Sequence, residues 1–256
     1  MRAALRVALL DPRAVLDETR PLVVPPRSVH LWAIATGADA PDAAALRARC
    51  ERLLDAADRE RAARMLFAAH RHDFLVSHAV LRGVLARYVG VAPDRIEFTL
   101  SAAGKPATTG VEFNLSHSRG RALLAVSARE PIGADLELER ADVDVLAIAG
   151  RYFHGAEFEA VRAAALQGEA DGRRAFFRHW VAKEAVLKGA GHGLGFPLDR
   201  FGVHFDAGGG GAGVVMLDAG RIAPDWRLHM LEVGEACPGA VAVRGPDWQI
   251  VPAGRP

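Results

Sequence analysis

The stretch from Ile132 to Glu137 (Ile-Gly-Ala-Asp-Leu-Glu) reads as a short strand with alternating apolar residues. Successive side chains of a strand point to opposite faces, so the apolar ones can enter a core while Asp135 and Glu137 project together from the other face. Two carboxylates on one face repel each other unless a positive group lies between them, and Mg²⁺, which takes oxygen ligands, is the usual solution. A pair of solvated carboxylates on an edge strand is the alternative.

The composition limits the classes of function. The 256 residues are 50% hydrophobic and 25% charged, which is typical of a globular protein with a sizeable core. The formal net charge of +1 gives no overall attraction to nucleic acid or to an acidic membrane, so any anion site must be a local cluster. No apolar run is long enough to span a membrane. Cys50 and Cys237 lie far apart without a metal-binding spacing, which predicts a reducing cytoplasm and two inert thiols.

The hydrophobic pattern predicts two halves that each run helices first and strands afterwards. The first half has a strand at 28–35, helices at 42–58 and 71–88, and strands at 111–115 and 122–127. The second half has helices at 143–149, 156–166 and 173–188, and strands at 201–205, 214–217, 226–232 and 241–244. This order predicts an α+β protein with halves at 28–128 and 129–256. Residues 1–27 are expected to be a loosely ordered extension outside the main fold.

A third acidic group lies in the segment Trp180-Val-Ala-Lys-Glu-Ala-Val-Leu-Lys188. Residues four apart share a helix face, so Trp180, Glu184 and Lys188 form one stripe. The neighbouring residues are largely apolar, which predicts a buried helix. Because a buried carboxylate needs a partner, a metal shared with Asp135 and Glu137 would satisfy Glu184. The alternative is an exposed Glu184–Lys188 pair that contributes only about 0.3 kcal/mol.

Further segments offer groups that can bind an anion. Phe113-Asn-Leu-Ser-His-Ser118 reads as a strand that ends in two hydroxyl residues around His117, where backbone N–H groups can form an anion nest; an ordinary turn histidine is the alternative. Ser116 and His117 face opposite ways on a strand, which argues against a nucleophile pair. Gly104-Lys105-Pro106 presents a lysine at a hairpin tip. Four arginines are either solvated or close over a phosphate: Arg59, Arg61, Arg64 and Arg71.

Together these segments resemble the 4′-phosphopantetheinyl transferases, specifically their Sfp-like, two-lobed group. Four family segments occur in the family's order, at residues 104–106, 113–118, 132–137 and 180–188. Residues 74–82 and 191–198 are also similar to family segments, and the resemblance covers residues 29–244. Two positions depart from the pattern, since Ala134 stands where the family has Ile or Val, and Val181 where it has Ser or Thr. Neither departure removes a polar ligand.

The resemblance implies two similar α+β halves related by pseudo-two-fold symmetry, with the active site in the cleft between them. It implies an enzyme that moves the phosphopantetheine arm of coenzyme A onto a serine hydroxyl of a carrier-protein domain and releases 3′,5′-ADP. Asp135, Glu137 and Glu184 would then bind Mg²⁺ or Mn²⁺. Glu184, or a water that it holds, would be the base, and Lys188 would contact the attacked phosphate. Coenzyme A, as substrate, would be held by Lys105, Ser116, His117, Asn114, Lys188 and Arg71.

The implied partners are acyl, peptidyl or aryl carrier domains, and a cytoplasmic monomer without nucleic-acid or membrane partners is expected. Two other functions stay open from the residues alone. One is a metal-dependent phosphodiesterase or nucleotide hydrolase that uses the same carboxylates, and the other is a non-catalytic coenzyme A-binding protein that docks carriers. Nothing in the sequence decides whether the acceptor belongs to fatty-acid, polyketide, siderophore or peptide synthesis.

Overall fold

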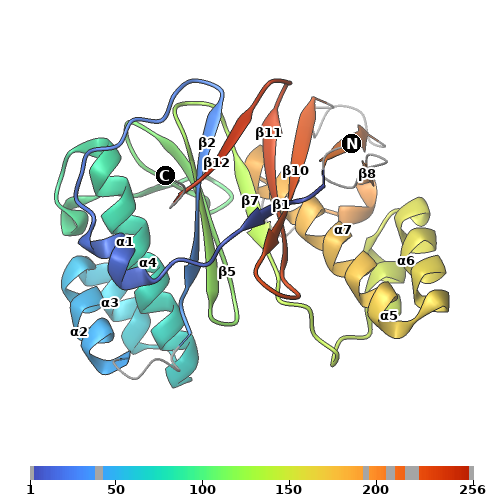
Figure 1. Ribbon diagram of the computed structural model, residues 1–256, viewed down its shortest axis with the longest axis horizontal. Coiled ribbons are helices and arrows are strands. Elements are labelled where there is room, and N and C mark those ends of the chain that lie inside the picture. Colours follow the sequence, from blue (N-terminus) through green and yellow to red (C-terminus); the bar gives the residue numbers. More distant parts are fainter. Residues whose placement is uncertain (1–2, 38–42, 193–195, 206–210, 217–224, 254–256) are drawn as a thin grey trace.

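The computed structural model describes residues 3–37, 43–192, 196–205, 211–216 and 225–253. Four layers follow one another across the molecule: helices, a sheet, a second sheet and helices (Figure 1). The first helical layer contains α1 (Pro12–Asp17), α2 (Ala43–Leu53), α3 (Ala56–Ala63) and α4 (Ala68–Val89). The last layer contains α5 (Val145–Tyr152), α6 (Gly155–Gln167) and α7 (Glu169–Ala190). None of the described helices is long and apolar enough to cross a membrane.

Two sheets form the middle of the molecule. The first has the strand order β12-β2-β6-β5, formed by β12 (Gln249–Pro252), β2 (Ser28–Ala35), β6 (Arg121–Ser127) and β5 (Glu112–Ser118). The second has the order β7-β11-β10-β9-β8, formed by β7 (Gly133–Leu136), β11 (Pro238–Arg244), β10 (Trp226–Val233), β9 (Gly211–Met216) and β8 (Phe201–Phe205), with β1 (Leu5–Val7) beside β10. A separate hairpin joins β3 (Thr99–Leu100) to β4 (Pro106–Ala107), and two 3₁₀ turns span Pro93–Arg95 and Leu198–Arg200.

Three apolar cores hold these layers together. The central core lies between the sheets, where residues such as Leu31 and Leu123 of the first sheet meet Leu136 and Val241 of the second. The outer face of the first sheet packs on α4, and the outer face of the second sheet packs on α7. Both sheets are therefore covered on both faces, and the two-lobed α+β architecture is confirmed. The pseudo-two-fold relation of the halves and their exact boundaries stay predictions.

The helix and strand predictions agree with the structure except where local side chains interrupt the pattern. The helix predicted over residues 71–88 is α4, and Gly90 ends it in the left-handed conformation with a φ of 78°. The single helix predicted over residues 42–58 is wrong. The chain breaks between α2 and α3, because Asp55 becomes the N-cap of α3 and accepts a hydrogen bond from the Asp58 N–H at 2.8 Å. Residues 1–2, 42, 193–195, 217 and 254–256 of the predicted ranges lie outside the described residues.

Both ends of the chain cross between the lobes, which corrects the expectation of a loosely ordered extension at residues 1–27. β1 pairs in parallel with β10 of the second sheet, and Leu10 then bridges to Ile34 of the first. Farther along, the Leu22 N–H donates to the Arg87 carbonyl at 2.9 Å. At the other end of the chain, β12 pairs in parallel with β2. These short segments pair because each supplies backbone partners and apolar side chains to a strand that is already in place.

The contact between β7 and α7 leaves no room for a side chain at Gly133. A Cβ atom there would lie 1.9 Å from the Ala185 carbonyl oxygen and 2.4 Å from the Gly189 nitrogen. Gly133→Ala should therefore lower the free energy of unfolding by about 3 kcal/mol, measured by urea denaturation, since strand and helix must separate. Gly155→Ala is the control, because a Cβ at Gly155 meets no atom within 4 Å. Equal stability of the two variants would contradict this close packing.

Candidate active site

The two sheets meet edge to edge where β5 lies beside β7. The Asn114 Oδ1 accepts a hydrogen bond from the Ala134 N–H at 2.8 Å. The Ser116 hydroxyl donates to Asp135 Oδ1 at 2.6 Å, and the Ser118 hydroxyl donates to Glu137 Oε2 at 2.7 Å. Alternation along β5 places these three polar side chains on one face of the strand. Asp135 of β7 and Glu137, directly after β7, are thus held by hydroxyl groups of the first lobe.

The helix α7 brings the third carboxylate and a lysine to the same edge. Lys188 Nζ donates to Asp135 Oδ1 at 2.6 Å and to Ser116 Oγ at 3.0 Å. Glu184, one turn earlier on α7, is only 7% exposed, and this part of the helix is largely buried as predicted, although Trp180 and Lys188 are only partly buried. A strand of each lobe and a helix of the second lobe therefore contribute to one polar cluster, which we call the acidic site (Ser116, Asp135, Glu137, Glu184, Lys188).

The acidic site carries more negative than positive charge. Burial and the neighbouring Asp135, with Glu137 adding to them and Lys188 opposing, raise the pKa of Glu184 to about 7. The pKa of Glu137 is also raised, chiefly by burial and partly by Asp135, against the hydrogen bond from Ser118. Asp135 Oδ2 is buried without a hydrogen-bond partner. The site thus contains one lysine and three carboxylates, and Asp135 Oδ2 has no hydrogen-bond donor.

A hard divalent cation fits the chemistry of this donor set. Carboxylate oxygens are the ligands that Mg²⁺ prefers, and the unpartnered Asp135 Oδ2 is an oxygen available for it. In the present side-chain arrangement, no three His, Cys, Asp or Glu groups within the described residues converge in a way that could hold a metal ion. Lys188 instead occupies the neighbourhood of Asp135 Oδ1. The three carboxylates are close enough for Asp135 and Glu137 to raise the pKa of Glu184, but their oxygens do not point at a common position for a metal ion.

The raised pKa of Glu184 makes the stability of the protein depend on pH when divalent ions are absent. The pKa is about 7 in the folded chain against an ordinary value of 4.5, so the fold favours the protonated carboxyl. Stability should fall as the pH rises from 4.5 to 7 and then level off, with a total loss of about 3 kcal/mol. Thermal unfolding in the presence of a chelator at several pH values would measure the slope. Glu184→Gln should flatten it, and equal slopes for the two proteins would contradict the assignment.

The strand β5 is longer than predicted, and this separates residues that were expected to act together. Residues 116–118 belong to β5, and the turn follows only at Arg119 and Gly120. They do not form an anion nest at a strand end, because they pair with β6. Ser116 is buried in the acidic site, whereas His117 points to the opposite face of β5, which packs on α4 through Phe113, and is itself exposed near the end of the strand. Partial loss of water around the imidazole lowers the pKa of His117, and positive neighbours, among them His78, Lys188 and Arg61, lower it further.

The other predicted coenzyme A ligands are spread around this edge. Lys105 Nζ donates to the Ile132 carbonyl at 2.9 Å, just before β7, and burial lowers the pKa of Lys105. Arg71 Nη2 donates to the Met65 carbonyl at 2.8 Å, and its Nε is buried without a partner. Lys105 therefore lies against the residue that precedes β7, and Arg71 lies in the first turn of α4, where it bonds back to the end of the α3–α4 turn.

Two side chains make contacts that the sequence did not predict: Ser118, which was expected to bind an anion, and Lys183. Ser118 binds Glu137, and its signal was the alternation of Asn114, Ser116 and Ser118 opposite the alternating strand 132–137. Lys183 is completely buried, and its Nζ donates to both oxygens of Glu157 at 2.8 and 2.6 Å. No local pattern distinguishes this lysine from a surface residue of the same helix.

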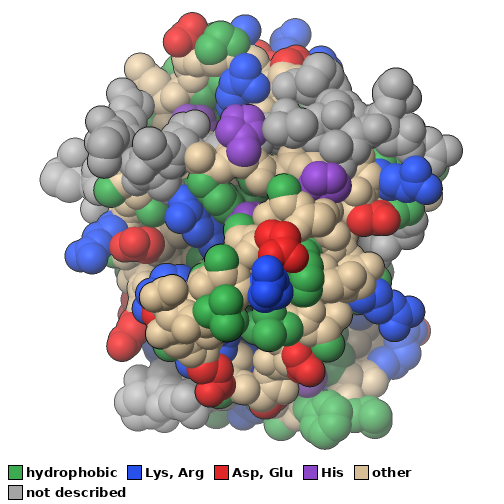
Figure 2. All heavy atoms as spheres, turned by 90° about the vertical axis from the view of Figure 1, so that its right-hand side faces the viewer, with side chains coloured by type: hydrophobic (Ala, Val, Ile, Leu, Met, Phe, Trp, Pro, Cys, Tyr) green, Lys and Arg blue, Asp and Glu red, His purple; other side chains and the backbone are tan. Residues whose placement is uncertain are grey.

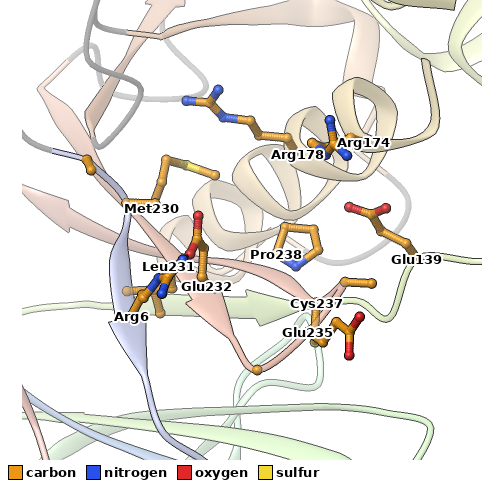
Figure 3. Close-up of a pocket in the computed structure, with 14 residues that line it drawn as sticks. Arg6, Glu139, Arg174, Arg178, Met230, Leu231, Glu232, Glu235, Cys237 and Pro238 are labelled. Carbon is orange, nitrogen blue, oxygen red and sulfur yellow. Dashed lines mark hydrogen bonds and ion pairs between the residues drawn. The ribbon is translucent and has the colours of Figure 1, made fainter. Parts of the chain in front are cut away.

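A separate depression of about 490 Å³ lies between β1, the turn before β11 and the first half of α7 (Figure 3). Its wall includes Arg174, Arg178 and Glu139, and Figure 3 shows the two arginines on the helix above Pro238. None of the residues of the acidic site lines it. This depression is therefore distinct from the candidate active site, and its Arg174 pairs with Asp171 at 3.0 Å.

Comparisons with known proteins agree on one family. The sequence model of the 4′-phosphopantetheinyl transferase superfamily matches residues 131–241. The chain is 34% identical over 229 residues to the 4′-phosphopantetheinyl transferase HetI of Nostoc sp., covering 86% of this chain and 90% of that protein. It is 31% identical over 155 residues to the transferase Sfp of Bacillus subtilis, covering 59% and 66%.

A more distant relative is the L-aminoadipate-semialdehyde dehydrogenase-phosphopantetheinyl transferase of Mus musculus, which is 26% identical over 251 residues and covers 91% of this chain and 80% of its own. The identity to the Nostoc protein over nearly its whole length carries the assignment. The chain belongs to the 4′-phosphopantetheinyl transferase superfamily and is a phosphopantetheinyl transferase.

Proposed function

We propose that this transferase moves the 4′-phosphopantetheine arm of coenzyme A onto a serine hydroxyl of a carrier-protein domain, with Mg²⁺ or Mn²⁺ held by Asp135, Glu137 and Glu184. One observation carries the proposal. Three carboxylates from β7 and α7 share one site with Lys188, and Asp135 Oδ2 there has no partner. Family membership supplies the group that is transferred, and this site supplies residues suited to the chemistry.

The reaction breaks the phosphoanhydride bond in the pyrophosphate of coenzyme A and forms a phosphoester bond to serine. The serine oxygen bonds to the phosphorus that carries pantetheine, the bond from that phosphorus to the leaving 3′,5′-ADP breaks, and the serine proton passes to a base. When bound, the divalent ion supplies positive charge next to the pyrophosphate. Glu184, or a water that it holds, accepts the proton; in the metal-free chain burial and Asp135 raise the pKa of this carboxyl to about 7.

Lys188 is suited to neutralise the attacked phosphate. Its Nζ bridges Asp135 and Ser116, and its side chain is 30% exposed, so the ammonium group can reach a ligand that enters the site. Ser116 and Asn114 hold β5 against β7 and thereby position Asp135, rather than touching coenzyme A directly. We therefore propose that Asn114 and Ser116, which were expected to bind coenzyme A, act as positioning residues.

The His117 imidazole offers a hydrogen-bonding group for the 3′-phosphate of coenzyme A. His117 is open to solvent on β5, and Arg61 and His78 are among its charged neighbours. Lys105 and Arg71 are the remaining candidates, each with donor groups directed at a backbone carbonyl in the structure. We further propose that the enzyme is a cytoplasmic monomer that binds neither nucleic acid nor a membrane.

The proposal is tested by incubating the protein with coenzyme A, Mg²⁺ and a panel of apo carrier proteins from fatty-acid, polyketide and peptide synthesis. Mass spectrometry should show one phosphopantetheine added to the carrier serine, and a chelator should abolish the addition. Release of ADP from coenzyme A in the absence of any carrier would instead indicate a hydrolase. No modification of any carrier in the presence of metal would contradict the proposal.

A further inference from the structure

The turn between α3 and α4 exposes two consecutive large apolar side chains. Leu66 is 91% exposed and Phe67 is 66% exposed. The other large hydrophobic residues that are exposed within the described part of the chain occur singly along the sequence. Ala68 and Ala69 are also exposed and extend the apolar surface onto the first turn of α4. An exposed apolar patch of this kind is typical of a contact surface for another protein.

The backbone of this turn is held in place. The Met65 N–H donates to the Ala62 carbonyl at 3.1 Å, and the Arg71 N–H donates to the Phe67 carbonyl at 3.0 Å. The Arg71 guanidinium closes the loop through the Met65 carbonyl at 2.8 Å. The two apolar side chains therefore project from an ordered turn, which reduces the entropy that a partner must overcome on binding.

Positive charge surrounds the pair. Arg61 and Arg64 lie on the preceding helix end and His70 and Arg71 on the following one, and the first turn of α4 contains no acidic residue. Glu60 and Asp73 are the nearest acids in the sequence; Glu60 pairs with Arg64 at 2.7 Å, and Asp73 accepts hydrogen bonds from the Thr36 hydroxyl and the Gly120 N–H. A partner that fits this surface carries acidic groups around an apolar centre, because opposite charges at the rim steer association and exclude other partners.

The surface adjoins the edge where the chemistry takes place. The Arg61 guanidinium lies 5.1 Å from the centre of the Phe74 ring, and His78 stacks on the same ring at 3.9 Å. His78 and Arg61 are in turn charged neighbours of His117 on β5, as is Lys188 of the acidic site. The turn is thus linked through Arg61, Phe74 and His78 to His117, which follows Ser116 of the acidic site along β5.

We propose that Leu66 and Phe67, within their ring of arginines, form the docking surface for the carrier domain, by contacting the apolar part of an acidic carrier helix. The inference rests on the proposed function and adds where the acceptor binds. It differs from the depression of Figure 3, whose two arginines lie on the second lobe.

The test is the double variant Leu66→Ser with Phe67→Ser, assayed with an apo acyl carrier protein and an apo peptidyl carrier domain. Its KM for the carrier should rise at least about tenfold, while kcat and the KM for coenzyme A stay within about twofold, since a contact made equally before and during the reaction changes KM alone. Arg64→Glu should raise the carrier KM in the same direction. Because both apolar side chains are exposed, the variant should keep its melting temperature.

Leu166→Ser is the matched control, because Leu166 is 76% exposed on α6 and far along the chain from the turn. The side of the molecule that carries α6 shows hydrophobic side chains interspersed with charges of both signs (Figure 2). The control should leave both KM values unchanged. An unchanged carrier KM in the double variant would overturn the docking surface, as would a rise in the KM for coenzyme A alone, which would assign the pair to the nucleotide.

A result that contradicts the proposed function can be told apart from one that contradicts only the docking surface. If the wild-type protein modifies no carrier, the transfer reaction itself is in doubt, and calorimetric binding of the apo carriers to wild type and double variant then tests the surface directly. Weaker binding by the double variant alone would support docking at Leu66 and Phe67. Equal binding by both proteins would overturn it.

Discussion

Replacing Glu184 by Gln should lower kcat for phosphopantetheinyl transfer by about 10³-fold while the protein stays folded. The substitution removes a carboxylate that is both a candidate metal ligand and the candidate base, whose pKa of about 7 allows it to accept a proton near neutral pH. It also removes one of three mutually repelling buried charges, so the melting temperature should be unchanged or higher at pH 8. Steady-state transfer to an apo carrier, together with thermal unfolding, measures both effects.

Glu139→Gln provides the comparison for this experiment. Burial raises the pKa of Glu139 as well, but this residue lines the depression of Figure 3 and lies outside the acidic site. Its activity should stay within about twofold of wild type, whereas Asp135→Asn should behave like Glu184→Gln. An active Glu184→Gln variant would remove Glu184 from the mechanism, even if the protein still required a divalent ion.

The acidic site could be predicted from sequence because its three carboxylates follow the two regular periods of protein structure. Asp135 and Glu137 are two apart on a strand, and Glu184 lies four residues before Lys188 on an apolar helix. What the sequence could not provide is which elements meet. The direct bond from Lys188 to Asp135 joins residues 53 positions apart and depends on the packing of α7 on β7.

The incorrect predictions, the end of β5 and the loose N-terminal extension, also arise because the sequence does not reveal which elements meet. Ser-His-Ser looks like a strand end by composition, yet pairing with β6 and side-chain bonds to β7 carry the strand to Ser118. The three residues of β1 contain no local signal that they will pair with a strand more than 220 positions later. Tertiary contacts therefore override local preference at the places where the two lobes are joined.

Replacing Lys183 by Met should lower the free energy of unfolding by about 3–5 kcal/mol, which is the largest stability effect we expect from a single side chain of this protein. The Lys183 side chain is 0% exposed, and its Nζ donates to both oxygens of Glu157 and to the Phe201 carbonyl at 2.5 Å. Glu157 in turn accepts from the Val203 N–H at 2.7 Å and from the His154 N–H at 3.0 Å. Without the lysine, a buried carboxylate would lose the only cation that pairs with it among the described residues.

The cost arises from the charge that is left behind, so it should shrink when Glu157 is neutralised as well. In a double-mutant cycle, the loss of unfolding free energy in the double variant Lys183→Met with Glu157→Gln should be smaller than the sum of the losses in the two single variants. The reason is that Gln keeps an acceptor for the Val203 N–H and leaves no buried charge. Arg162→Met is the surface comparison, since it breaks the exposed pair with Glu159 on the same helix α6 and should cost less than about 1 kcal/mol. Urea denaturation of the five proteins measures all of these terms. If Lys183→Met costs no more than Arg162→Met, the buried pair does not hold α6 and β8 against α7, and the position of Glu184 next to Lys183 on the helix must have another support.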